Sequence, residues 1–468
     1  MNKKEIFKRL YNDYTKKYLN KILLSVFFSI LVAGSTSSIA WLLDPAIKKI
    51  FIEKDQTLIL VIPLLIIIAF AVKGISLYVA KILMINVGEE VKMKLQVDML
   101  KSLISADTQY IDNKHSGKFI SNLTYDVNHI THLLSSAILT LFKDSLTLIG
   151  LLTVMFMQNW KLSIISIIMI PLAAFFSKKL GKRVGKVVTE AQEKSGYLTT
   201  YLVELFKNHK LIKIFQKETY ETSRADKTLE GVKDRQKKLN EIYARSSPIM
   251  EVLTGFMIAI LIFYSGNLII EDELGINNFF SFLAAMMLAY QPIRSLATIN
   301  MAAYQGAAAF KRISNIIDRE IKIKELINAP NLVLKNSNIE FKNVGFKYDT
   351  TNEKAIKEIN INIKGNSMAA FVGHSGAGKS TIINLLPRFY DPQDGVIEID
   401  GQNIKDVSLS SLRKNLSLVS QDIILFDDTI KNNIAYANPT ATDDEIMKAC
   451  EFAASDQFIN KLPNGYNT

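Results

Sequence analysis

Long apolar segments constrain this chain more than any other feature. Six of them occupy much of the first 300 residues, at about 22–47, 58–85, 136–157, 162–177, 249–270 and 278–300. Each is near the roughly 20 residues that a helix needs to cross the hydrocarbon core of a bilayer. Backbone N–H and C=O groups find no water there, so a spanning segment must satisfy them within a helix or a closed barrel. The segments predict an all-α membrane domain with six spans.

The connections between the segments indicate which side of the membrane each one faces. Two are long, about 86–135 and 178–248, and the others are short. Residues 1–21 are basic, and in the second long connection Lys and Arg outnumber Asp and Glu. Because basic loops stay cytosolic, we expect the N-terminus, both long connections and everything after the sixth span in the cytosol. We expect no cleavable signal peptide, because the first apolar run is too long for one.

The formal net charge of +11 raises the question of a nucleic-acid partner. The charge lies mostly beside apolar segments, where membrane topology explains it, and no nucleic-acid-reading motif accompanies it. We therefore expect no nucleic-acid partner. The single cysteine, Cys450, rules out a disulfide framework within the chain and is predicted to be a buried, unreactive thiol.

Both long connections are helical in composition and predict helical hairpins that project from the membrane. Their bends are expected near 107–117 and 205–213, where short transverse helices would dock onto a nucleotide-binding domain. The alternative is a cytosolic helical bundle with no coupling role.

After a charged stretch at 318–336, the hydrophobic period changes from helical to strand-like. Strands are predicted on alternating runs within 339–348 and 359–363, at 396–400 and 416–420, and at 368–372, which would be a buried strand. Helices are predicted at 380–386 and 443–458. Thr442 and Glu445 form a possible capping box at the start of the last helix.

The segment GHSGAGKST at 373–381 fits the phosphate-loop pattern G-x-x-x-x-G-K-[ST]. Glycines let backbone N–H groups close around a polyphosphate, and the helix that follows adds a favourable dipole. Lys379 would reach the β- and γ-phosphates, and the Ser380 hydroxyl would bind Mg²⁺. The predicted ATP-binding residues of the loop are Gly373, His374, Ser375, Gly376, Ala377, Gly378, Lys379, Ser380 and Thr381.

Further residues accompany the loop. Tyr348 stands upstream, Gln421 lies in LVSQDIILF at 418–426, and the segments DDTIKNNI at 427–434 and LPNGYNT at 462–468 follow. With these, essentially the whole chain resembles an ATP-binding-cassette (ABC) exporter half-transporter. The resemblance implies ATP and Mg²⁺ as cofactors, with Tyr348 stacking on adenine. It also implies that Gln421 contacts Mg²⁺ alongside Ser380 and senses the membrane domain. Alternatively, Tyr348 is an ordinary aromatic residue of a strand, and Gln421 is an ordinary surface residue.

The resemblance also implies the fold. It is an all-α six-helix transmembrane domain with long cytosolic helical arms, followed by an incomplete α/β P-loop ATPase domain. The latter would hold a β-rich N-terminal subdomain and the start of a RecA-like core. The expected boundaries are a cytosolic N-terminal elbow at 1–21, the transmembrane domain at 22–310, a linker at 311–336 and the N-terminal part of the ATP-binding domain at 337–468.

Three motifs that complete such a cassette do not occur in the sequence. They are a Leu-Ser-Gly-Gly-Gln-type signature, a Walker B strand ending in Asp-Glu, and a switch histidine. VIEID at 396–400 resembles a Walker B strand only superficially and is interpreted as structural. We therefore expect Thr468 to be a truncation point, and the chain to bind nucleotide without hydrolysing it. The Q-loop residue Gln421 is the only contributor to catalysis expected within these residues.

Within the exporters, the membrane domain looks most like the lipid A flippase group, whose inner cavity carries basic side chains for the substrate's phosphates. Lys73, Lys143 and Arg294 match such positions, and Gln291 replaces a fourth. A charge within a span is costly unless it faces water or a partner, so these residues are candidates for a substrate cavity. Asp144 adjoins Lys143 but is expected to point elsewhere on the helix. The alternative is that the basic side chains snorkel toward the membrane surface.

These observations predict an ATP-driven exporter of the bacterial inner membrane, working as a homodimer with cytoplasmic ATPase domains. Its partners would be a second copy of itself, surrounding membrane lipids, and an amphipathic, anionic lipid such as lipid A or a phospholipid, which it flips outward. One alternative is a multidrug or peptide exporter of the same architecture, in which the three basic residues would be dispensable. Others are an ATP-gated channel or sensor, and a catalytically dead fragment.

Overall fold

The computed structural model of the chain describes residues 3–112, 116–271, 273–420 and 425–468. It divides into two compact units, Met1–Ile323 and Lys324–Thr468, each with its own hydrophobic core.

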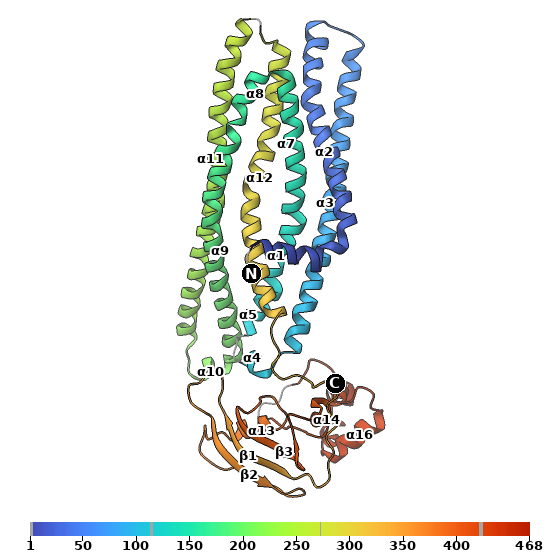
Figure 1. Cartoon of the computed structure of the whole chain (residues 1–468), viewed down its shortest axis with the longest axis vertical. Coiled ribbons are helices and arrows are strands. Elements are labelled where there is room, and N and C mark those ends of the chain that lie inside the picture. The colour runs from blue at the N-terminus through green and yellow to red at the C-terminus, as the bar shows by residue number, and fades with distance from the viewer. Residues whose placement is uncertain (1–2, 113–115, 272, 421–424) are drawn as a thin grey trace. The chain divides into compact units, whose positions relative to one another are not determined.

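The described part of the first unit is helical (Figure 1). Its α-helices are α1 (Lys3–Arg9), α2 (Leu19–Pro45), α3 (Leu58–Ile104), α4 (Thr108–Asp112), α5 (Ser116–Ser121), α6 (Val127–His132), α7 (Ile138–Gln158), α8 (Trp160–Ile167), α9 (Met169–Lys207), α10 (His209–Ile214), α11 (Glu218–Ile270) and α12 (Ile276–Ile317). Short π- and 3₁₀-helical turns join some of them: η1 (Leu10–Thr15), η2 (Lys16–Tyr18), η3 (Ala46–Ile52), η4 (Asn122–Asp126) and η5 (Leu133–Ala137).

Each of the six predicted spans lies in helix. They fall in α2, α3, α7, the pair α8 and α9, α11 and α12, in that order. Among the described residues, four helical stretches are long and apolar enough to cross a membrane: Lys4–Ile52, Leu58–Ile104, Ser116–Gln158 and Glu251–Ile270. The short connection expected between the third and fourth spans is a tight turn. Its Asn159 has an extended backbone, and its side chain accepts a hydrogen bond of 3.0 Å from Leu162 N, which caps α8.

The outer surface of α3 explains why residues 58–85, its first part, are predominantly apolar. Leu60, Ile67 and Ile75 are 77%, 65% and 65% exposed, although the helix packs against α2. A helix in water would not leave such a large apolar face uncovered, whereas a helix surrounded by lipid needs no protein cover there. The exposed face therefore fits a membrane-spanning position.

One core of the first unit lies where α3, α6, η5 and α12 meet. Val87, Val91, Leu95 and Met99 recur every fourth residue of α3 and are fully buried, which is the stripe expected for one helix face. The N-terminal segment joins this core through Tyr14, whose hydroxyl donates to Asp98 at 3.0 Å. A second core joins residues of α2, α7, α8, α11 and α12.

The predicted cytosolic hairpins are present as helices. Beyond the fourth and fifth spans, α9 and α11 run alongside each other, and the short helix α10 lies between them in the chain (Figure 1). The short helices predicted near the two bends correspond to α4 and α10.

A buried ion pair joins the cytosolic extensions of these helices. Asp126 of η4 has no exposed surface, and Arg312 of α12 donates to its two carboxylate oxygens at 2.8 and 2.7 Å. Gln192 of α9 donates to the same carboxylate at 3.1 Å. A buried carboxylate is stable only when its charge is matched and its oxygens are hydrogen-bonded. This one carboxylate therefore holds three segments together.

The second unit contains a small antiparallel sheet with helices around it. Its elements are β1 (Ile339–Phe346), β2 (Ile356–Ile363), α13 (Lys379–Leu385), β3 (Asp394–Ile399), β4 (Gln402–Asn403), α14 (Leu409–Lys414), α15 (Ile430–Ala435), α16 (Asp443–Phe452), α17 (Asp456–Ile459) and η6 (Gly465–Asn467). The strand order is β2-β1-β3-β4, and Phe341 pairs with Ile361 on one side and Ile397 on the other. Residues of β1 and β3 pack against α13 in the core. The capping box of Thr442 and Glu445 at α16 is confirmed, and Cys450 is buried.

Two strand predictions are wrong. Residues 368–372 and 416–420 are not strands, and Met368 and Val372 are 99% and 94% exposed. A strand needs a neighbour for its backbone N–H and C=O groups, and in the described part of the unit no strand pairs with either segment. Apolar composition indicated strands, but pairing decides whether they form.

Replacing Asp126 should destabilise the first unit. Asp126→Asn leaves the Arg312 guanidinium without its matching charge, so we expect a loss on the order of 3 kcal/mol in the free energy of unfolding. Unfolding of the purified protein in mixed detergent micelles, followed by helical circular dichroism, measures the loss.

Glu230→Gln is the matched control, since Glu230 and Lys233 form an ion pair whose side chains are 65% and 63% exposed. We expect it to change stability by less than about 0.5 kcal/mol. Equal stability of the two variants would contradict a structural role for the Asp126 ion pair.

Candidate functional site

The phosphate-loop segment of the second unit has the backbone that its sequence predicts. Gly376 and Gly378 take left-handed conformations, with φ of +84° and +85°. A Cβ at Gly378 would lie 2.9 Å from the carbonyl oxygen of Ala355, so a side chain has no room there. Both features require glycine, because larger residues rarely adopt this backbone.

The loop leads directly into α13, which begins at Lys379. Its N-cap is Gly378, so no side chain caps the first backbone N–H groups of the helix. Such N–H groups suit phosphate oxygens. The Lys379 ammonium donates to the carbonyl oxygens of Gly373 and His374 at 2.9 and 2.8 Å, so it lies across the loop. A polyphosphate would replace these two acceptors with stronger anionic ones.

The remaining loop residues lie at the surface. Gly373, His374, Ser375, Gly376, Ala377 and Ser380 are exposed, whereas Thr381 is buried. The exposed Ser380 hydroxyl at the start of α13 is therefore open to a metal ion that accompanies a phosphate. Gln421, the second predicted Mg²⁺ contact, lies outside the described residues.

The structure brings Tyr348 next to the phosphate-loop helix. Its hydroxyl lies 3.0 Å from the Thr381 hydroxyl, in the first turn of α13. The Tyr348 ring meets Phe346 and Tyr390 edge-on, at centroid distances of 4.8 and 5.4 Å. The Tyr348 side chain is half-buried. The arrangement is compatible both with stacking on a base and with a packing role.

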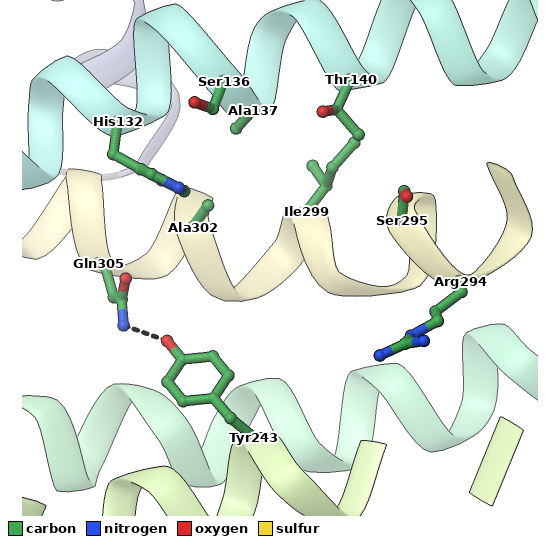
Figure 2. A pocket seen from close by; sticks show the side chains of 10 residues that line it. All are labelled: His132, Ser136, Ala137, Thr140, Tyr243, Arg294, Ser295, Ile299, Ala302 and Gln305. Atoms are coloured by element: carbon green, nitrogen blue, oxygen red, sulfur yellow. Dashed lines mark hydrogen bonds between the residues drawn. The ribbon is translucent and has the colours of Figure 1, made fainter. Parts of the chain in front are cut away.

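The first unit contains a polar cavity of about 410 Å³ among helices that are otherwise largely apolar. Its lining comes from α6, η5, α7, α11 and α12 (Figure 2). The residues are His132, Ser136, Ala137, Thr140, Tyr243, Arg294, Ser295, Ile299, Ala302 and Gln305. Of the three basic residues that the sequence nominates, Arg294 lines this cavity. Its guanidinium extends away from α12 toward the side from which Tyr243 rises (Figure 2).

Lys73 and Lys143 are not part of this lining. Lys73 lies over the ring of Phe70, 5.9 Å from its centroid. Lys143 forms an ion pair with Asp144, whose side chain is only 3% exposed. The expectation that Asp144 points elsewhere is wrong. The flexible lysine chain reaches back to a buried carboxylate that would otherwise be unmatched.

Sequence reasoning missed the other polar residues of the cavity. His132, Tyr243 and Gln305 come from three helices, and Gln305 donates a hydrogen bond from its amide nitrogen to the Tyr243 hydroxyl (Figure 2). Single polar residues at helix positions have no distinctive spacing. The one available signal was their place just beyond the cytosolic ends of predicted spans.

The sequence matches two known protein families. Residues 22–293 match the ABC transporter transmembrane region, and residues 356–466 match the ABC transporter family.

Similar proteins extend over nearly the whole chain. An ATP-dependent lipid A-core flippase of Syntrophus aciditrophicus is 36% identical over 99% of this chain and 77% of its own length. One from Desulfotalea psychrophila is 36% identical over 100% of this chain and 81% of its own length.

A solved structure has the same fold. It is a bacterial Atm1-family ABC exporter with ATP bound, with a TM-score of 0.81 and 23% identity, and it covers 96% of this chain and 80% of its own.

Three findings indicate one family. They are the helical unit with its apolar outer surface, the phosphate loop at the start of α13, and these matches. The chain belongs to the ABC transporters, with an ABC transmembrane region followed by an ABC ATPase domain.

Proposed function

We propose that this protein is an ATP-driven exporter that flips an amphipathic, anionic lipid across the bacterial inner membrane. The observation that carries the proposal is Arg294, a guanidinium within a predicted span that lines a polar cavity of about 410 Å³. A permanent charge at that depth is costly unless it serves an anionic ligand or a pathway. Arg suits this role because its planar group binds phosphate oxygens in a bidentate manner. The similar proteins named lipid A-core flippases support a lipid substrate.

Lys73 and Lys143 would extend the basic surface of the substrate site. Lys143 is matched by Asp144, so its net contribution to anion binding is smaller than that of Arg294. We assign the elbow to residues 1–21, the transmembrane domain to 22–310, the linker to 311–336 and the ATP-binding domain, on the cytoplasmic side, to 337–468.

ATP would bind at Tyr348 and the loop residues 373–381, with Mg²⁺ held by Ser380 and Gln421. We propose a homodimer in which two such domains enclose ATP. Nucleotide binding would favour one of two arrangements of the membrane helices and so turn the cavity outward, because a ligand shifts a conformational equilibrium by its difference in affinity for the two states.

Residues 1–468 are expected to bind ATP without hydrolysing it. Their sequence holds no signature, Asp-Glu Walker B or switch-histidine segment to position the attacking water. Purified chain of these residues should bind a fluorescent ATP analogue and release no phosphate. Phosphate release that disappears in Lys379→Ala would contradict this expectation, since a contaminating ATPase would not respond to that change.

Tyr348→Ala should weaken ATP binding about tenfold, because base–aromatic stacking contributes on the order of 1–3 kcal/mol. Inorganic triphosphate, which has no base, should bind as before. Competition against a fluorescent ATP analogue measures both affinities.

Tyr348→Phe is the matched control, because it loses only the hydroxyl that meets Thr381 and keeps the ring. If Tyr348→Ala weakened the binding of triphosphate as much as that of ATP, Tyr348 would be a packing residue next to β1 and not an adenine contact.

Arg294→Gln should weaken the binding of phosphatidylglycerol about tenfold and leave phosphatidylcholine unaffected. A hydrogen bond to a charged group contributes about 1.5–3 kcal/mol, and the zwitterionic lipid gains little from a single cation. Native mass spectrometry of the purified protein in detergent, with lipids of identical acyl chains, gives both affinities.

Lys238→Gln is the charge-matched control, since Lys238 is exposed on α11 and does not line the cavity. Equal weakening by both substitutions would indicate nonspecific attraction of anionic lipid and overturn Arg294 as a substrate residue.

A further inference from the structure

A second cavity of the first unit lies outside the predicted spans. It has a volume of about 370 Å³ and is lined by residues of α5, η4, α9 and α12. Thr189 and Arg312 are the lining residues nearest to a predicted span, and each follows the end of one, at 177 and 300, by twelve residues. Twelve helical residues correspond to about 18 Å. The cavity therefore belongs to the hairpin helices, which are predicted to be cytosolic.

Two glycines explain why a cavity forms here. A Cβ at Gly117 of α5 would lie 2.9 Å from the Thr200 hydroxyl and 3.0 Å from the Thr200 backbone nitrogen, so glycine is needed for α5 to approach α9 this closely. One turn away on α9, a Cβ at Gly196 would meet no described atom within 4 Å. The contact at Gly117 therefore holds the two helices together, and the absence of a side chain at Gly196 leaves space beside it.

Two buried polar side chains line this space and have no hydrogen-bond partner among the described residues. They are Ser121 and Asn122, which are only 5% and 8% exposed. Buried polar groups are normally hydrogen-bonded to protein or water. The Ser121 hydroxyl and the Asn122 amide are therefore available to a molecule that enters the cavity.

The charged residues of the lining favour a cation. Glu193 and Glu204 of α9 form no ion pair with a described residue. Lys118 is the one lining cation without such a pair among the described residues, because the Arg312 guanidinium is matched by Asp126. Two unmatched carboxylates and one unmatched ammonium leave the cavity with one net negative charge, which attracts cations.

The spacing of the two carboxylates favours a long ligand over a compact ion. Glu193 and Glu204 are eleven residues apart, which is close to three turns of α9 and about 16 Å along its axis. Tyr197 also lines the cavity, one turn after Glu193, and the residue is 55% exposed. The face of a tyrosine ring attracts cationic groups. A slender molecule with a cationic group at each end and a methylene chain between them would meet both carboxylates and the ring.

We propose that this cavity is a binding site for a linear polyamine. Its terminal ammonium groups bind Glu193 and Glu204, and its methylene chain lies against Tyr197. The Ser121 hydroxyl and the Asn122 amide oxygen accept hydrogen bonds from its remaining N–H groups. The site shares no lining residue with the Arg294 cavity, so it does not depend on which lipid is transported. A bound polyamine joins α5, η4, α9 and α12 and stabilises the arrangement of the hairpin helices in which the cavity is formed.

Isothermal titration calorimetry of the purified protein in detergent, without nucleotide and at low ionic strength, measures the affinity for spermidine. Spermidine should bind and raise the temperature of thermal unfolding, because a ligand of the folded state stabilises that state. Butylamine has one ammonium group and should bind about tenfold more weakly, since it cannot meet both carboxylates at once. Glu193→Gln and Glu204→Gln should each weaken spermidine about threefold, the size expected for one exposed ion pair. Glu230→Gln, which removes an exposed carboxylate of α11 outside the lining, should not.

Gly196→Leu places a side chain in the cavity and should abolish spermidine binding. Without spermidine, this variant should unfold at the same temperature or higher, because its Cβ meets no described atom and leucine favours a helix more than glycine does. Gly231→Leu is the matched control, since it makes the same change on α11, where a Cβ would meet only the Lys194 side chain at 4.0 Å. Gly231 does not line the cavity, so this variant should bind spermidine as before.

Three results would overturn the proposed site. The first is that the unaltered protein does not bind spermidine. The second is that butylamine binds as tightly as spermidine, or that Mg²⁺ at the same concentration stabilises the protein equally, because either result would indicate general attraction of cations. The third is that Gly196→Leu keeps its affinity for spermidine, which would place the binding elsewhere on the protein.

Discussion

The cost of placing polar groups among apolar helices organises the first unit. Water is scarce there, so a charge or amide must find a protein partner or face a cavity. Asp126 is matched by Arg312 and Gln192, and Lys143 is matched by Asp144. The Asp126 contacts join three segments, whereas the Lys143–Asp144 pair lies within α7. Arg294 meets the same constraint by facing a polar cavity, and for that reason it is the residue on which a functional interpretation rests.

The same constraint operates at the other end of the helices. The Gln158 amide donates to the Ser281 hydroxyl at 3.1 Å and accepts from Asn278 at 2.6 Å, while Asn277 donates to Asp44 at 2.5 Å. These contacts tie the end of α7 to the start of α12 and to α2. Polar side chains thus join the helices at the turns, and apolar packing joins them between the ends.

In the second unit, backbone geometry rather than side-chain pairing forms the phosphate-binding loop. Left-handed glycines shape the loop, and a helix without a capping side chain begins directly after it. Such a site depends on a short stretch of sequence and needs little from the remainder of the unit. Tyr348 and Thr381 are the exception, since their contact joins residues that the sheet and α13 bring together.

Features that depend on residues close together in the sequence could be predicted from it. Features that depend on contacts between distant segments could not. Local features depend on the length, hydrophobicity or glycine content of a single segment. They are the spans, the hairpin helices, the Asn159 turn, the Thr442 capping box and the phosphate loop. The strands at 368–372 and 416–420 were predicted wrongly, because a strand also requires a partner.

The sequence by itself determined the family, the spans and the loop that suits a polyphosphate. Only the tertiary structure decided which polar side chains meet: Asp126 with Arg312, 186 positions away, and Tyr243 with Gln305, 62 positions away. The spacing of these residues along the chain does not mark them as partners. Their pairing therefore follows only from how the helices pack.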